Sequence, residues 1–190
     1  LSKEWRRSQI KAVKAMCQEN EDAIAAALHS DLGRGKFEAI ALELLPIYTE
    51  VDDALSSLNE WMEPEQKSTP LGMAPSTSEV HSVPFGVSLI ISPFNYPFSL
   101  CLGPLISAIA AGNCVLIKPS ELTPAVEYIV SQLLPKYMDT TCIDCVFGGI
   151  QVSQNLLSKK FDKIFFTGST RVGKIVMKAA AEHLTNVTME

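Results

Sequence analysis

The 190-residue sequence has no long hydrophobic run and no secretory signal peptide. Its longest apolar segment, Leu100 to Ala111, is shorter than the roughly 20 residues that a helix needs to cross a bilayer, and Gly103 and Pro104 interrupt it. We therefore expect an intracellular protein, with the cytoplasm favoured and no membrane segment in these residues. Because Leu1 is not an initiator methionine, we expect natural sequence upstream. Membrane association through a further C-terminal tail stays open.

Concentrated positive charge is also missing. The chain has 16 Lys and Arg against 21 Asp and Glu, a net charge of −5, and its basic residues are scattered along the sequence. Nucleic-acid-binding domains carry basic patches, so we expect no nucleic-acid partner.

The sequence lacks the even set of cysteines that a disulfide framework requires. Five cysteines occur at irregular spacing: Cys17, Cys101, Cys114, Cys142 and Cys145. This number fits reduced thiols. The C-x-x-C pair at 142–145 has no further Cys or His partners, so we interpret it as structural and expect no metal site.

The first third of the chain is predicted to be helical. Apolar residues recur at three- and four-residue spacing in 3–28 and again in 39–61, which predicts a helical hairpin. The segment 64–78 is rich in Pro, Ser, Thr and Gly and predicts an exposed connector. Residues 79–83 could belong to a β-arm that crosses to a partner. These boundaries define an N-terminal helical region, 1–63, and a connector, 64–84.

From residue 85 to residue 190, strand-like and helix-like segments alternate. The predicted strands are 87–91, 114–117, 143–147, 164–166 and 186–189, and the predicted helices are 100–111, 125–138, 152–157 and the segment from Thr170. This alternation predicts an α/β fold, a Rossmann-like open parallel sheet with helices on both faces. Ligands of such sheets bind at the carboxyl ends of the strands. The loops 92–97, 118–121 and 167–173 should therefore form one site.

The segment Phe165–Lys174 reads as strand, glycine-framed turn and helix. Free N–H groups and the dipole at a helix start attract phosphate, so this turn predicts a phosphate-bearing cofactor. An alternative is the triphosphatase phosphate loop, G-x-x-x-x-G-K-[ST], which Gly168 to Lys174 matches in part. Ile175 occupies its last position and cannot supply the hydroxyl that ligates magnesium. A turn that only links strand to helix is the other alternative.

The two earlier loops also carry polar groups. Asn95 lies between Pro93 and Pro97, and its carboxamide could donate hydrogen bonds to a developing oxyanion, or it could simply cap a helix. Lys118 and Glu121 follow the second strand and could bind the hydroxyls of a ribose, or they could form an ordinary surface ion pair.

The loops occur together and in a defined order. With the last residues of the chain they make four segments: Pro93-Phe94-Asn95-Tyr96-Pro97, Lys118-Pro119-Ser120-Glu121, Phe166-Thr167-Gly168-Ser169-Thr170-Arg171-Val172-Gly173 and Val187-Thr188-Met189-Glu190. All four segments resemble motifs of the aldehyde dehydrogenase superfamily. The helical start and the segment 108–113 look most like the class 3 or fatty aldehyde dehydrogenase branch. The resemblance covers nearly the whole chain.

This resemblance implies oxidation of an aldehyde to a carboxylic acid by NAD(P), through a cysteine thiohemiacetal and thioester. Asn95 would then serve as the oxyanion donor and Glu190 as the general base. Lys118 and Glu121 would bind the adenosine ribose, and residues 85–190 would form the NAD(P)-binding domain. The remaining implied cofactor contacts are Phe94, Phe166, Gly168, Ser169, Thr170, Arg171, Val172 and Gly173.

The family's nucleophilic cysteine would lie beyond Glu190, and none of the five cysteines replaces it. We therefore expect the isolated chain to be inactive. Glu121 should disfavour a 2′-phosphate, so NAD is preferred over NADP. The resemblance also implies an apolar aldehyde and a homo-oligomer, with a dimer favoured. A non-catalytic assembly module that kept the fold is the remaining hypothesis.

Overall fold

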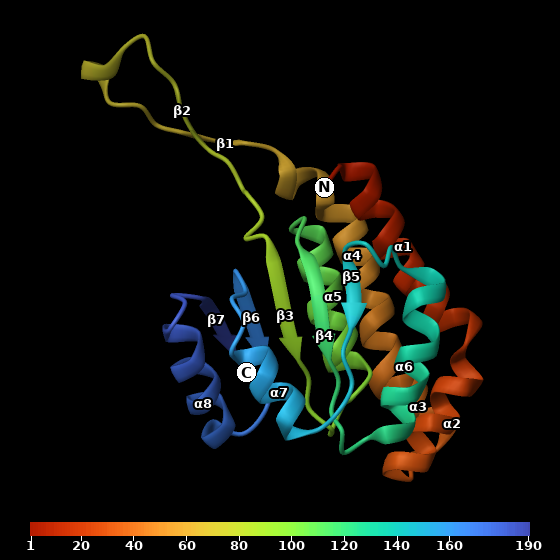
Figure 1. The fold of residues 1–190 in the computed structure, drawn as a ribbon. Coiled ribbons are helices and arrows are strands. Elements are labelled where there is room, and N and C mark those ends of the chain that lie inside the picture. The colour runs from red at the N-terminus through yellow and green to blue at the C-terminus, as the bar shows by residue number, and fades with distance from the viewer.

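A five-stranded parallel sheet forms the centre of the computed structural model, which describes all residues from Leu1 to Glu190. The strands follow the order β5-β4-β3-β6-β7 (Figure 1). Their bounds are β3 Val87–Ile91, β4 Cys114–Lys118, β5 Ile143–Cys145, β6 Lys163–Phe166 and β7 Asn186–Met189. The predicted parallel sheet is confirmed.

The central strand β3 has neighbours on both edges, which explains its apolar sequence. Val87 pairs with Cys114 of β4, and Ser88 pairs with Lys163 of β6. Successive residues point to opposite faces: Ile90 belongs to the larger hydrophobic core, while Leu89 belongs to a smaller core on the other side. Both faces of the sheet are therefore buried.

Helices cover the two faces unequally (Figure 1). On one face, α5 (Ser99–Ala110) and α6 (Pro124–Tyr137) pack on the sheet, and α1 (Lys3–Glu19) and α4 (Leu45–Met62) contact α5 from outside. On the other face lie α7 (Ile150–Leu157) and α8 (Thr170–Ala181). The first face holds 30 buried apolar residues and the second holds 6, so the first face contains most of the core.

The N-terminal region is more segmented than the predicted hairpin. The first predicted helix divides at Asn20 into two helices, α1 and α2 (Glu21–Leu32). The second predicted helix begins at Lys36 with α3 (Lys36–Ala39). A π-helical turn, η1 (Ile40–Leu44), connects α3 to α4. Pro46 explains this interruption, because it has no N–H to donate to the carbonyl of Leu42. The helical spacing alone did not reveal the π turn.

The connector at 64–84 projects from the body of the molecule (Figure 1). It contains two short antiparallel strands, β1 (Glu65–Lys67) and β2 (Ser78–Val80), with a 3-10 turn, η2 (Leu71–Met73), between them. Nearly all residues of this connector are exposed. The strand β2 overlaps the β-arm expected at 79–83, whereas the strand β1 was not predicted from the Pro- and Ser-rich composition. No helix in the structure has both the length and the apolar character that crossing a bilayer requires.

Candidate active site at the carboxyl edge of the sheet

The polar loops that follow β3, β4 and β6 meet at one edge of the sheet. The N–H of Ser92 donates to the carbonyl oxygen of Lys118 over 3.2 Å, and the N–H of Thr167 donates to that of Ile91 over 3.1 Å. Each loop is thus tied to the end of a neighbouring strand. Because all the strands run parallel, their polar ends lie together, as the sequence predicted.

A cavity of about 310 Å³, which we call the rim cavity, lies between two of these loops. Its lining residues are Pro93, Phe94, Asn95, Thr167, Gly168, Ser169 and Glu190. Five of the predicted site residues, including both predicted catalytic residues, therefore line one cavity. The β4 loop with Lys118 and Glu121 lies along the same edge but does not line the rim cavity.

Glu190 reaches the rim cavity because β7 pairs with β6. Met189 lies opposite Phe166, and the N–H of Glu190 donates to the carbonyl oxygen of Phe166 over 3.0 Å. The hydroxyl of Thr167 donates to Oε2 of Glu190, also over 3.0 Å. The carboxylate is exposed and holds a defined hydrogen bond, so it could accept a proton from a water molecule in the cavity.

Lys118 differs from the surface ion pair that the sequence left open. Only 1% of the residue is exposed, and its ammonium donates to the carbonyl oxygen of Pro119 over 2.7 Å and to Oε2 of Glu121 over 2.8 Å. Partial burial is the largest single influence on Glu121 and raises the pKa of its carboxyl. The hydrogen bond from Lys118, a backbone hydrogen bond and the charge of Lys118 together outweigh it and keep that pKa below its ordinary value. The structure therefore holds a buried ammonium and a charged carboxylate at the end of β4.

The turn after β6 is short and leads directly into α8. Ser169 caps this helix, and its hydroxyl oxygen accepts from the N–H of Val172 over 3.4 Å. The N–H groups of Thr170 and Arg171 make no hydrogen bond within the chain. Phe166 is buried beneath the turn, and a Cβ on Gly168 would lie 2.7 Å from its ring. Phe166 thus supports the turn from below, while the helix start presents free donors.

The triphosphatase alternative gains no support from this geometry. A phosphate loop wraps its backbone around phosphate before the helix begins. Here α8 already begins at Thr170, so Gly173 is a buried residue within the helix and Lys174 follows it there. No group of three or more metal-ligating side chains is present to hold a magnesium ion.

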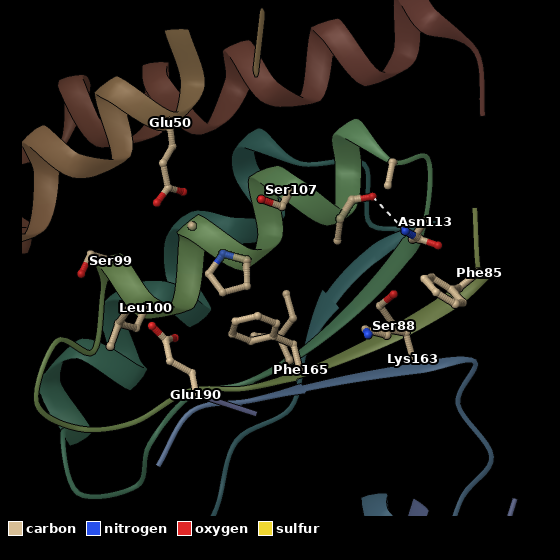
Figure 2. A pocket seen from close by; sticks show the side chains of 15 residues that line it. Glu50, Phe85, Ser88, Ser99, Leu100, Ser107, Asn113, Lys163, Phe165 and Glu190 are labelled. Atoms are coloured by element: carbon tan, nitrogen blue, oxygen red, sulfur yellow. Dashed lines mark hydrogen bonds between the residues drawn. The ribbon is translucent and has the colours of Figure 1, made fainter. Parts of the chain in front are cut away.

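A larger cavity of about 390 Å³ lies between α5 and the sheet and also reaches Glu190 (Figure 2). Glu50 of α4 points into it from the opposite side, toward Glu190 (Figure 2). Burial raises the pKa of Glu50, and the negative charges of Asp53 and Glu190 add to this effect. Helical spacing placed Glu50 on an amphipathic helix, and no local signal distinguished it from an ordinary surface residue.

Two further charged residues near the site, Arg34 and Glu43, were not predicted from the sequence. Glu43 has no exposed surface, and its carboxylate pairs with Arg34 and accepts from the N–H groups of Phe98 and Ser99. Burial raises the pKa of Glu43, although these donors oppose the shift. One signal was available, since Glu43 is a lone acid in the apolar run 39–47.

Four of the five cysteines have a thiol pKa above the ordinary value. Burial raises the pKa of Cys17, Cys101 and Cys145 to about 12 in each case, and burial followed by a hydrogen bond with Cys142 raises that of Cys114 to about 11. None of the five lines the rim cavity. A thiol with so high a pKa is a weak nucleophile near neutral pH.

We expect iodoacetamide at pH 8 to alkylate Cys17 and Cys101 of the folded chain more than about 100-fold more slowly than in the urea-unfolded chain. Burial blocks access to both thiols, and their raised pKa values leave little thiolate. Time-resolved peptide mass spectrometry measures each rate separately. Rapid alkylation of Cys101 in the folded chain would contradict its burial beneath the helices.

Known proteins match this chain over its whole length. A model of the aldehyde dehydrogenase family matches residues 1–190. Mouse aldehyde dehydrogenase family 3 member B2 is 46% identical over 187 residues, which are 98% of this chain and 39% of the relative. Family 3 member H1 of Arabidopsis thaliana is 43% identical over 187 residues, again 98% of this chain and 39% of the relative. The chain thus spans about two fifths of the length of these relatives.

Solved structures agree with this match. The substrate-bound AldH of Staphylococcus aureus superposes with a TM-score of 0.97 at 42% identity, covering 100% of this chain and 41% of that chain. A Mycobacterium tuberculosis aldehyde dehydrogenase complexed with NAD+ gives a TM-score of 0.84 at 24% identity, covering 97% of this chain and 38% of that chain, and shows the shared fold alone. The chain belongs to the aldehyde dehydrogenase family, and its family 3 relatives confirm the predicted class 3 branch.

Proposed function

We propose that this chain is the cofactor-binding segment of an enzyme that oxidises an aldehyde to a carboxylic acid with NAD(P). The observation that carries the proposal is the arrangement of Asn95, the turn 167–169 and Glu190 around the rim cavity. Family membership supports the class of reaction. When bound, the nicotinamide cofactor supplies the acceptor for the hydride of the aldehyde.

The residues at the sheet edge fit a dinucleotide. The free N–H groups of Thr170 and Arg171 can hydrogen-bond a pyrophosphate at the start of α8. The ammonium of Lys118 and the carboxylate of Glu121 can bind the two hydroxyls of a ribose. Because Glu121 is negatively charged, it repels a 2′-phosphate, which favours NAD over NADP.

Asn95 acts as the oxyanion donor and Glu190 as the general base. The side chain of Asn95 is exposed at the rim cavity, where its carboxamide can donate to the oxyanion that develops on the aldehyde carbon's oxygen. Glu190 can remove a proton from the water that hydrolyses the thioester. We assign the cysteine nucleophile to the part of the family's length that this chain does not span, so the 190-residue chain alone should be inactive.

Other parts of the structure support an apolar substrate and a dimer. The larger cavity beside Glu190 is lined in part by Leu100, Pro104 and Phe165, which suit an apolar aldehyde. The projecting connector exposes Leu71 and Met73, which a second copy of the chain could cover. Both assignments belong to the proposal.

Isothermal titration of NAD into the folded chain tests the proposal. We expect Lys118→Met to weaken NAD binding by about 10- to 100-fold, because it removes a charged hydrogen bond. The exposed Lys174→Met should change NAD binding less than about twofold. Thermal unfolding must show that Lys118→Met is still folded.

Titrations with NAD, NADP and ATP separate the cofactor-binding proposal from the assembly module and the triphosphatase. A folded chain that binds neither NAD nor NADP would contradict the cofactor assignment and favour the assembly module. Magnesium-dependent ATP binding that Lys174→Met abolishes would favour the triphosphatase.

A further inference from the structure

Glu43 is the only fully buried carboxylate in the structure. Buried carboxylates are costly unless they are paired and hydrogen-bonded, so their partners indicate what they are for. Glu43 has three partners: the guanidinium of Arg34, the N–H of Phe98 at 3.1 Å and the N–H of Ser99 at 2.7 Å. The last two donors lie at the point where the β3 loop, 92–98, enters α5. Glu43 therefore caps a helix that starts 56 residues later in the chain.

Two local irregularities bring the pair together. Glu43 lies in the π-helical turn η1, where the N–H of Leu45 donates to the carbonyl oxygen of Ile40, five residues earlier. Single π turns occur often at functional sites. Arg34 follows Gly33, which has a φ of 70° and ends α2. A left-handed glycine turns the chain sharply there. As a result, Arg34 comes from a loop and Glu43 from a helix.

Arg34 holds the middle of the β3 loop. Its Nη2 donates to the carbonyl oxygen of Asn95 over 2.6 Å, and its guanidinium lies 4.5 Å from the centre of the Tyr96 ring. Only 12% of its side chain is exposed. Cation–π contacts and hydrogen bonds of a planar guanidinium are strongly directional, so they fix both position and orientation. Arg34 and Glu43 together contact the loop at Asn95 and at the residues that follow it, from Tyr96 to the start of α5.

We propose that Arg34 and Glu43 are positioning residues for Asn95: they hold the backbone of the β3 loop so that the Asn95 carboxamide stays at the rim cavity. This inference rests on the proposed function, which gives Asn95 its role as oxyanion donor. An oxyanion donor works only when it is fixed before charge develops. A displacement of about 1 Å at a reacting group can lower a rate by about 100-fold.

The test uses the protein expressed from its complete natural gene. Arg34→Lys keeps the charge but loses the planar fork and the contact with Tyr96, and Glu43→Gln keeps the shape but loses the charge. We expect each variant to lower kcat for aldehyde oxidation by about 10- to 100-fold while the dissociation constant of NAD changes less than about twofold. Glu38→Gln is the matched control, since Glu38 is the exposed second partner of Arg34 at 3.8 Å and does not touch the loop. Its kcat should stay within about twofold of wild type.

A double-mutant cycle with Asn95→Ala separates positioning from general support of the fold. If Arg34 acts through Asn95, Arg34→Lys causes no further loss of kcat in the Asn95→Ala protein. Losses that multiply, or an Arg34→Lys variant with wild-type kcat, would overturn the positioning role while the role of Asn95 stands. An Asn95→Ala protein with undiminished kcat would overturn both the oxyanion assignment and this inference. If Glu43→Gln does not fold, the cycle with the conservative Arg34→Lys still decides the question.

Discussion

Replacing Asn95 by alanine in the protein expressed from its complete natural gene is expected to lower kcat for aldehyde oxidation by about 100- to 1,000-fold. The carboxamide is exposed at the rim cavity, which Asn95 shares with the proposed base Glu190 although the two residues are 95 positions apart in the sequence. Removing one oxyanion donor weakens binding of the transition state more than binding of the ground state. Steady-state kinetics with a saturating aldehyde therefore show the loss in kcat.

Two measurements serve as controls for the loss of kcat: the KM for NAD and the kcat of a matched asparagine variant. The KM for NAD should change little, because Asn95 contributes to chemistry, whereas the proposed ribose and pyrophosphate contacts come from the β4 loop and the start of α8. Asn155→Ala is the matched variant, since Asn155 is an exposed asparagine of α7 outside both cavities, and its kcat should equal that of wild type. An Asn95→Ala enzyme that works at the wild-type rate would exclude the oxyanion role and leave the asparagine as a turn residue.

The largest effect on stability is expected from the core between α5 and its covering helices. Leu102 has no exposed surface and lies in α5, which contacts both the sheet and the outer helices α1 and α4. Leu102→Ala should lower the free energy of unfolding by about 2–5 kcal/mol, because it removes buried methyl groups and leaves a cavity that the surrounding layers cannot close. The midpoint of thermal unfolding should fall by roughly 5–15 °C.

Leu71→Ala provides the comparison for this core variant. In the monomeric chain Leu71 is 94% exposed on the projecting connector, so its truncation there should change the free energy of unfolding by less than about 0.5 kcal/mol. Calorimetry or denaturant titration of both variants measures the contrast. A Leu102→Ala chain as stable as wild type would mean that the core between α5 and the outer helices contributes little to folding.

The β-strands and the turn after β6 were predictable because their determinants are local. The segment 87–91 is apolar and bounded by turn residues, and strands buried on both faces have this composition. Similarly, the sequence Phe166-Thr167-Gly168-Ser169 contains the last strand residue, the glycine and the N-cap in order, and the structure uses each of them in that way.

The site could be predicted in part. The loops with Asn95, Lys118 and Ser169 follow predicted parallel strands, and this topology alone places them at one edge. The burial of Lys118 was not predictable, since a lysine at a strand end is usually solvated. In the structure the β4 loop folds back over the side chain, so that Pro119 and Glu121 accept hydrogen bonds from its ammonium.

The sequence by itself determined three features: the alternation of strands and helices, the polar loops at the strand ends, and the family motifs. These features were readable because hydrophobic periodicity and turn chemistry act over a few neighbouring residues. Only the tertiary structure decided that Arg34 and Glu43 contact the β3 loop and that Glu50 and Glu190 share a cavity. These contacts join residues some 55 to 140 positions apart. Such contacts depend on how the helical layers pack against the sheet. The residues next to a side chain in the sequence do not determine that packing.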